Sequence, residues 1–563
     1  MQPIITEMRK QETVNVILAI LMGAGTAIVA YYFVSTVQFL ASFRPSIENL
    51  NTLEFRGLDF SLKIAVTILL SAGFISLLLF FFKLPRFHGP ADAIIGANDK
   101  ELGIDIKSGL LSAVASIAAI GGGAPVGQYG PLVHFGATLS AIIKKFARLK
   151  DTSGEVLLGC GVAAAISAAF SAPLAGILFA HEVVLRHFAL RTFAPVTIAS
   201  ATAFAVMQNF FPMDPILPQI DTSISNFSEV LSLAIIGLIG GVIAVIFMRL
   251  FSFFGAQAAK VPGPVYTRPF YPAVTLIIIA SFVPQIMGLG TETVIATIEG
   301  KIGISVLIGI LLLKTVMTAF SISFSFFGGV FSPALLIGIT FGGAVGAFGM
   351  ANFGFSAETA ALCTLAGMGA VISSTIGAPI STILIVLELT QDYQATTGVM
   401  ISVVFANLIS NELFGRSLFD KQLFARGFDM QLSRQDLKLS KITIGTLATK
   451  EYCPLSPHEN AQGMIEKLKE GGFAEGYIIS EDNKLVSKVE ALDLIDGQTS
   501  GDKDYFRLLE TDSILACADK LSEFVGESAP ILNSEGVLVG VINEADVFKA
   551  YKDASEKSHQ EEV

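Results

Sequence analysis

The sequence predicts a polytopic α-helical membrane protein, built from two repeats with broken helices, that carries a water-soluble α+β domain at its C-terminal end. Of its 563 residues 52% are hydrophobic and 15% are charged, whereas soluble globular chains carry about 25% charged residues. The charge is uneven, because residues 441–563 hold 24 of the 48 acidic side chains but 12 of the 37 basic ones. Two apolar regions broken by Gly and Pro also resemble each other. This composition excludes a soluble enzyme, a disordered chain and a nucleic-acid-binding protein.

Apolar segments of two kinds make up the predicted membrane domain. The continuous runs, each long enough to span a bilayer, are Val14–Val34, Ile64–Phe82, Leu231–Phe251 and Ile304–Phe326. We interpret the first run as a membrane helix, because it is too long for a signal peptide and lacks a small-residue cleavage site. In residues 108–206 and 331–409, Gly and Pro interrupt the apolar sequence repeatedly. Broken backbone at membrane depth needs protein or a cavity around it, which is typical of a transport pathway.

The two broken regions align with each other, which indicates an internal repeat. Gly127–Gly136 matches Gly329–Gly338 at a shift of 202 residues, and Gly161–Glu182 matches Gly367–Glu388 at a shift of 206. Two halves with matched broken segments are typical of transporters and channels built from inverted repeats. We therefore expect two repeats of inverted topology.

Each repeat contains a proline that follows a turn and precedes an apolar helix. Pro131 and Pro333 suit the first helical position, because proline lacks the N–H group that would have no intrahelical partner there. A helix start presents unpaired N–H groups and about half a positive charge. Two such starts that meet at mid-membrane would bind an anion without a lysine or arginine, and weakly enough for it to leave. His88-Gly89-Pro90 marks a third candidate start, although a single proline more often only kinks a helix.

The residues around these prolines resemble signatures of the CLC family of chloride channels and transporters. The GREGP motif of that family is similar to Gly127-Gln128-Tyr129-Gly130-Pro131, and its GxFxP motif is similar to Gly329-Val330-Phe331-Ser332-Pro333. Residues 170–179 and 366–370 resemble further signatures, and the likeness covers roughly residues 15–425. The resemblance implies a homodimer, not an enzyme, that lies in membrane lipid with one anion pathway in each subunit. It also implies that backbone amides around Val330 and Phe331 bind the central anion.

Departures from the family patterns bear on mechanism. Tyr129 stands where the gating and proton-carrying glutamate of the family would be, and Gln128 replaces the neighbouring arginine. Val183 stands at the inner glutamate of the family's exchangers. The GSGIP motif of the family falls on residues 86–90 without its serine, and Phe419 replaces the inner-gate tyrosine. A tyrosine keeps its proton at neutral pH, since its reference pKa is about 10, and it donates a hydrogen bond without mimicking an anion.

These departures favour passive conduction of chloride or another small monovalent anion, by a channel or an uncoupled transporter. We expect Tyr129 to act as the gate, and residues 127–131 and 329–333 to supply the anion site. Phe419 would form an apolar inner constriction, and His88 would lie along the route.

Three other functions remain open at this point. A proton-coupled anion exchanger would need a histidine route, because histidine titrates near neutrality. The candidate histidines are His88, His134 and His181. A cation carrier is disfavoured, since the membrane segments lack a carboxylate pair, and a membrane sensor without ion flux would rely on the C-terminal domain. We expect Glu182 and Glu388 to make structural helix contacts, and Lys314 to snorkel towards the membrane surface.

Residues 441–563 show a soluble α+β pattern that occurs twice. The expected strands are 475–480, 484–489, 528–532 and 537–542. Asp493 recurs as Asp546, 53 residues later, and the pattern resembles a pair of CBS domains. The resemblance implies that these aspartates could hold the ribose of an adenine nucleotide, although Glu490 and Asn543 stand where a serine or threonine is usual. The alternative is a dimerisation module in which the aspartates cap helices.

The predicted organisation follows from these patterns. It comprises a membrane domain at 1–430 with repeats at roughly 60–215 and 228–425, a linker at 431–440, a CBS pair at 441–555 and an acidic tail at 556–563. The resemblance implies that the C-terminal domain is cytoplasmic. The four cysteines are widely spaced, so we expect no disulfide framework, no metal site and no cofactor besides the possible nucleotide.

Overall fold

Apolar helices form the first of two units in the computed structural model, residues Met1–Arg426, and the second unit is Gly427–Val563. The structure describes residues 2–47, 49–99, 103–147, 151–211, 217–218, 227–429, 432, 436, 439–440, 442–502, 505–522, 524 and 526–562. The predicted linker at 431–440 therefore lies mostly outside the described residues. In the described part of the chain, eight helices are long and apolar enough to cross a membrane.

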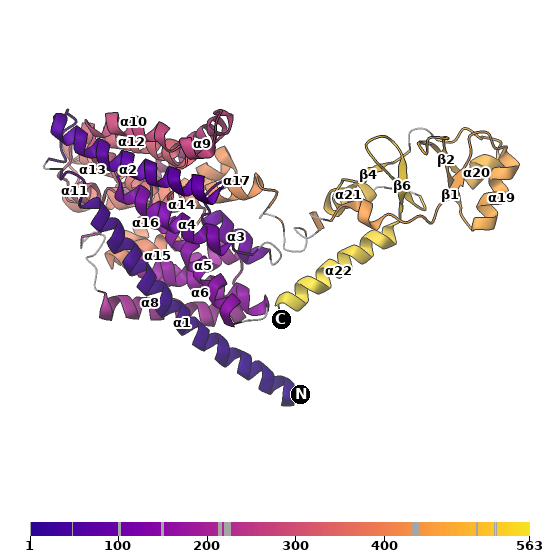
Figure 1. Cartoon of the computed structure of the whole chain (residues 1–563), viewed down its shortest axis with the longest axis horizontal. Coiled ribbons are helices and arrows are strands. Elements are labelled where there is room, and N and C mark those ends of the chain that lie inside the picture. The colour runs from indigo at the N-terminus through magenta and orange to yellow at the C-terminus, as the bar shows by residue number, and fades with distance from the viewer. Residues whose placement is uncertain are drawn as a thin grey trace. The chain divides into compact units, whose positions relative to one another are not determined.

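Twenty helical segments build the described part of the first unit (Figure 1). They are α1 Gln2–Ala41, α2 Leu58–Phe82, α3 Pro90–Asn98, α4 Ile106–Gly121, α5 Tyr129–Ala147, α6 Asp151–Phe170, α7 Pro173–Phe179, η1 Ala180–Leu185, α8 Leu190–Phe210, α9 Phe227–Lys260, η2 Val265–Thr267, α10 Phe270–Ala280, η3 Pro284–Ile286, α11 Thr291–Ile298, α12 Ile304–Ser323, α13 Phe331–Phe353, α14 Ala357–Ile376, α15 Pro379–Thr390, α16 Tyr393–Phe414 and α17 Leu418–Phe424. The first three predicted continuous runs fall in α1, α2 and α9, and the fourth, Ile304–Phe326, extends three residues past the end of α12 at Ser323.

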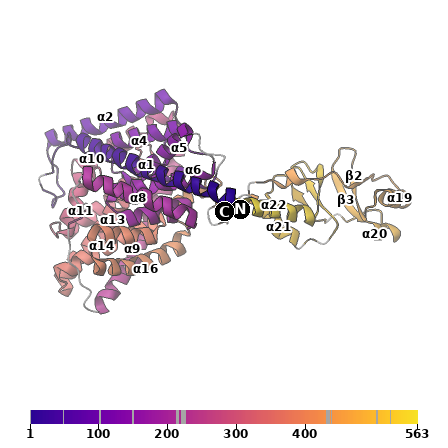
Figure 2. The same cartoon turned by 90° about the horizontal axis from the view of Figure 1, so that it is seen from below.

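The matched segments of the two repeats occupy equivalent places in the fold. Helix α5 packs on α6 as α13 packs on α14, and α14 is buried from Thr359 to Ile376. Helices α9, α14 and α16 lie side by side (Figure 2). Small residues let these helices approach closely, as membrane helices need in the absence of a hydrophobic driving force between them. The broken segments are therefore enclosed by protein, which satisfies their backbone at membrane depth.

Two glutamates cap helices of the opposite repeat in a reciprocal way. The carboxylate of Glu388, near the end of α15, accepts the backbone N–H groups of Leu174 and Ala175 at the start of α7, both at 2.8 Å. The carboxylate of Glu182, in η1, accepts the N–H groups of Ile380 and Ser381 at the start of α15, at 3.0 and 2.8 Å. Each carboxylate satisfies orphan donors and complements the positive end of a helix. The predicted structural role of both glutamates is confirmed.

The second unit contains two small α/β halves of the predicted kind. Its elements are η4 Ile444–Leu447, β1 Cys453–Leu455, α19 Ala461–Gly471, β2 Glu475–Ile479, β3 Leu485–Glu490, α20 Ala491–Ile495, β4 Leu508–Leu509, α21 Ile514–Ser522, β5 Ala529–Leu532, β6 Leu538–Ile542 and α22 Glu544–Glu562. The sheets have the orders β1-β2-β3 and β4-β5-β6, each with one parallel and one antiparallel pair. The equal topology shows that the repeated sequence pattern is a structural repeat.

Candidate anion site

The two proline motifs meet in the middle of the first unit. The N–H of Gly127 donates to the Gly329 carbonyl at 2.7 Å, and the N–H of Gly329 donates to the Gly127 carbonyl at 2.6 Å. A Cβ atom at Gly329 would lie 2.7 Å from the Gly130 nitrogen and 3.2 Å from Cδ of Pro131, so only glycine fits. The starts of α5 and α13 therefore lie next to each other, although they are 202 residues apart in sequence.

Both helices begin two residues earlier than the prolines suggested. Helix α5 starts at Tyr129 and α13 at Phe331, so Pro131 and Pro333 are each the third helical residue. The difference has a simple cause, because none of the first four N–H groups of a helix has an intrahelical partner. Proline is therefore tolerated throughout the first turn. The free N–H groups belong to the residues at and just before each start.

Three aromatic rings fill the space between the two helix starts. The Tyr129 ring stacks on Phe170 with centroids 3.8 Å apart and an interplanar angle of 23°. Phe331 approaches Tyr129 edge-on at 5.3 Å and Phe170 at 5.0 Å. All three side chains are buried. We call these residues the aromatic cluster. Sequence analysis did not identify Phe170 as a site residue, although it ends α6 directly before a Pro-containing break.

Tyr129 closes one side of a cavity of about 800 Å³, which we call the Tyr129 cavity. Gln128 and Ser332 also line it, and both are at least 94% buried. Within the described residues, Oε1 of Gln128 and Oγ of Ser332 find no hydrogen-bond partner. Buried polar atoms are seldom left unsatisfied, so their place in this wall points to a polar ligand or water.

A second cavity of about 260 Å³ lies on the other side of the motif and is lined by Gly329, Val330 and Phe419. We call it the Phe419 cavity. Arg86, Arg268 and Arg426 bring positive charge to its wall, and Asp92 brings the one negative charge among its lining residues. The Phe419 side chain is 5% exposed. The two motifs thus separate two cavities, one beside Tyr129 and one beside Phe419.

His88 lies near the Phe419 cavity but does not line it. Its backbone N–H donates to Oγ of Ser112 at 2.8 Å, and its ring lies 5.9 Å from the buried His134 ring. Its neighbours Phe87 and Gly89 form the cavity wall instead. The ring of His88 therefore faces α5 rather than the cavity.

Two basic side chains, Arg44 and Lys314, lie in or next to the wall of the Tyr129 cavity. Arg44 lines it together with the acidic Glu292. Lys314 is fully buried in α12, and its Nζ donates to the carbonyls of Ile286 and Gly288 at 2.8 and 2.7 Å. The prediction that Lys314 snorkels to the membrane surface is wrong, because Ile286 at the end of η3 and Gly288 in the loop after it supply carbonyl partners inside the protein. Lys314 thus fixes a loop in the wall of this cavity.

Comparisons with known proteins identify the family of the chain. The profile of the family described as Voltage gated chloride channel matches residues 70–411. The chain belongs to this family. It is therefore a multi-pass membrane protein of a family of anion channels and transporters, whose members are not enzymes.

Two relatives illustrate the range of functions in the family. The chain is 28% identical to the H(+)/Cl(-) exchange transporter ClcA of Vibrio parahaemolyticus over 330 residues. The aligned segment covers 57% of this chain and 70% of that protein. The chain is 27% identical over 338 residues to the voltage-gated ClC-type chloride channel ClcB of Escherichia coli, covering 59% and 80%. Family membership thus leaves the choice between channel and exchanger open.

Solved structures share the fold. A slow cyanobacterial Cl-/H+ antiporter has a TM-score of 0.65 at 19% identity, covering 74% of this chain and 99% of that one. A eukaryotic CLC transporter has a TM-score of 0.63 at 20% identity, covering 94% and 97%. A CLC-type fluoride/proton antiporter has a TM-score of 0.61 at 22% identity, covering 72% and 97%.

The predicted nucleotide residues of the second unit lie at the starts of two helices. Asn543 precedes α22 and accepts the N–H of Asp546 through Oδ1 at 2.9 Å, while Oδ2 of Asp546 accepts the Asn543 N–H at 3.5 Å. This reciprocal pair is a helix capping box. Asp493 occupies the third position of α20 and is half-buried. Nucleotide binding stays a prediction. Within the described residues, no group of three or more His, Cys, Asp or Glu side chains is placed to hold a metal ion.

Proposed function

We propose that the protein conducts chloride or another small monovalent anion passively, as a channel or an uncoupled transporter. The observation that carries this proposal is the aromatic cluster between the two cavities. Tyr129 packs there on Phe170 and Phe331, at the place where a carboxylate would be needed to exchange a proton for an anion. A phenol donates a hydrogen bond to an anion but carries no negative charge at neutral pH. The pathway then lacks a group that competes with the anion at its centre.

The two helix starts supply the attraction for the anion. Their free N–H groups carry partial charges, which hold an anion less tightly than a full ammonium or guanidinium would. Oγ of Ser332 adds a hydroxyl donor on the side of the Tyr129 cavity. An ion that is held weakly at several sites can leave as readily as it enters, which passive conduction requires.

A proton-coupled anion exchanger is the second candidate, because two histidines meet inside the first unit. The rings of His88 and His134 lie 5.9 Å apart, and Nε2 of His134 is buried without a partner in the described part of the chain. Such a pair can take up and pass on a proton. Two of the solved structures with this fold are those of proton antiporters.

Reversal potentials in a pH gradient separate these two functions. The purified protein is placed in liposomes with equal chloride on both sides and a difference of two pH units. We expect no shift of the reversal potential, and a shift would refute passive conduction. The variant Tyr129→Glu should introduce flux that depends on external pH, whereas Tyr129→Phe should leave flux independent of pH. Flux of Tyr129→Glu that stays independent of pH would contradict the role of Tyr129 as the gate.

We further propose that two copies form a homodimer and that the second unit is a cytoplasmic, CBS-like regulatory pair. Support comes from the resemblance stated for the sequence and from the repeated βα topology of this unit. Its two halves share an antiparallel bridge between Lys484 and Val537, which ties them together as a pair. An adenine nucleotide is the proposed ligand of this pair.

A further inference from the structure

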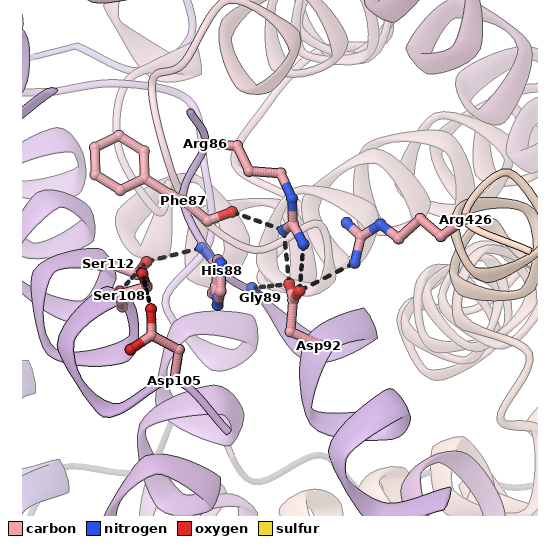
Figure 3. A network of polar contacts seen from close by, with 9 residues as sticks. All are labelled: Arg86, Phe87, His88, Gly89, Asp92, Asp105, Ser108, Ser112 and Arg426. Atoms are coloured by element: carbon pink, nitrogen blue, oxygen red, sulfur yellow. Dashed lines mark hydrogen bonds and ion pairs between the residues drawn. The ribbon is translucent and has the colours of Figure 1, made fainter. Parts of the chain in front are cut away.

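Asp92 lines the Phe419 cavity. Its carboxylate is held by Arg86, Gly89 and Arg426 as a bound anion would be (Figure 3). Asp92 is the third residue of α3. Its Oδ2 accepts the N–H of Gly89 at 2.9 Å and Nη1 of Arg86 at 2.9 Å. Its Oδ1 accepts Nη2 of Arg86 at 2.5 Å and Nη1 of Arg426 at 3.1 Å. A helix N-terminus and two guanidinium groups are the partners that proteins use to bind small anions.

The charge of this cavity depends on Asp92. Arg86, Arg268 and Arg426 line it, and Asp92 is the one acidic residue among its lining residues, so the wall has a net charge of +2. Nε of Arg268 is buried and finds no partner among the described residues. Without the Asp92 charge, the arginines would attract a mobile anion more strongly, and the anion would leave more slowly.

The position of the cavity connects this charge to transport. Gly329, Val330 and Phe419 line the same cavity, so an ion that passes the motif enters it next to Phe419. The side chain of Asp92 is 11% exposed and lies at the wall rather than in the motif. An anion that reaches Arg86 or Arg426 must therefore compete with the carboxylate that already occupies them.

We propose that the Asp92 carboxylate, which is tethered to the protein, competes with the transported anion for Arg86 and Arg426. The anion binds to these arginines when the carboxylate moves away, and the carboxylate displaces the anion when it returns. The proposal rests on the anion transport proposed above. The carboxylate keeps the arginines from trapping the anion, so the cavity attracts anions while releasing them quickly. Asp92 thus sets the affinity for the anion and its rate of release, and it is not a gate that closes the pathway.

A purely structural role for Asp92 makes a different prediction. Asp92 completes the cap of α3 and links it to Arg426, the last residue of the first unit. If this link served only stability, Asp92→Asn and Arg426→Gln would both lower the melting temperature, and neither would tighten anion binding.

Chloride binding and chloride efflux of the full-length protein test the proposal. We expect Asp92→Asn to bind chloride about tenfold more tightly and to lower the maximal efflux rate from liposomes, since one opposing charge is removed from a cavity of low dielectric. Arg426→Gln should weaken chloride binding about tenfold, and the double variant should return towards the wild-type affinity. The control is Asp59→Asn, the same chemical change in an exposed ion pair with Lys63. Chloride affinity of Asp92→Asn that is unchanged or weaker would overturn the proposal.

A second variant keeps the proposal testable if Asp92→Asn does not fold. Arg268→Gln removes a cavity charge whose Nε has no partner in the described chain, and it should weaken chloride binding about threefold. An unchanged affinity would show that anions do not bind in this cavity. Failure of the proposed function is distinguishable, because it would appear as proton-coupled flux, or no anion flux, in the wild-type protein.

Discussion

Replacement of Glu388 by glutamine should weaken the contact between the two repeats. Its carboxylate accepts two N–H groups at the start of α7 from the far end of α15, 213 and 214 residues away in sequence. Glutamine has nearly the same shape, but it carries no charge and has only one acceptor oxygen. Glu388→Gln therefore removes one of the two hydrogen bonds and the attraction between a full charge and a helix N-terminus.

The expected loss follows from these contacts. A hydrogen bond to a charged group contributes about 1.5–3 kcal/mol, and a charge at a helix terminus about 0.3–1 kcal/mol. Because Glu388 is half-buried, we take the low end of both ranges, which gives about 2 kcal/mol for one hydrogen bond and the charge. That energy corresponds to a factor of about 30 in an equilibrium constant. Glu182→Gln should lose at least as much, because Glu182 also accepts the hydroxyl of Ser381 at 2.5 Å.

The rate of thermal inactivation in detergent is a suitable assay, since a chain of this size unfolds irreversibly. The monodisperse fraction is followed by size-exclusion chromatography after heating for different times. We expect Glu388→Gln to lose this fraction up to about 30 times faster than the wild type. Glu54→Gln, a change in an exposed loop, is the matched control and should not differ from the wild type. If Glu388→Gln and Glu54→Gln decay at the same rate, the reciprocal caps do not stabilise the fold.

Two further predictions concern the motif contact and the second unit. Gly329→Ala should lower chloride efflux at least about tenfold, because its Cβ would separate Gly329 from Gly130, whereas Gly73→Ala, with open space around its Cβ, should have no effect. Cys517 is fully buried, and burial raises the pKa of its thiol to about 11, so maleimide should label it at pH 8 at least about a hundredfold more slowly in the folded protein than in the urea-unfolded protein. Rapid labelling of Cys517 in the folded protein at pH 8 would contradict this.

Sequence patterns predicted those parts of the architecture in which a residue type is tolerated at few structural positions. Proline after a turn predicted the helix starts of α5 and α13 to within two residues, because few positions tolerate a missing N–H. The matched glutamates Glu182 and Glu388 were assigned to helix contacts, and the structure confirms those contacts. The family was identified from the glycine and proline motifs, and the family profile confirms it.

Contacts between distant segments could not be predicted in the same way. Phe170 lies 41 residues from Tyr129, and although it begins one of the stretches that resemble the family, no sequence pattern shows that its ring stacks on Tyr129. Lys314 was expected at the membrane surface, because the local sequence does not show its carbonyl partners. These partners, Ile286 and Gly288, lie 28 and 26 residues earlier in the chain. Asp92 was not identified from the sequence, because Arg426 lies 334 residues away and approaches it only in the folded chain.

The packing of the aromatic cluster would limit the rate of the proposed passive conduction. If Tyr129 is the gate proposed above, an anion passes from the Tyr129 cavity to the Phe419 cavity only when the Tyr129 ring leaves its contacts with Phe170 and Phe331. Each aromatic pair contributes about 0.5–1.5 kcal/mol, so breaking two pairs costs about 1–3 kcal/mol. At equilibrium this corresponds to an open fraction of roughly 0.5–15%. The fraction depends on packing and temperature, not on a proton, so enlarging or shrinking Phe170 should change the rate of conduction while leaving its pH dependence unaltered.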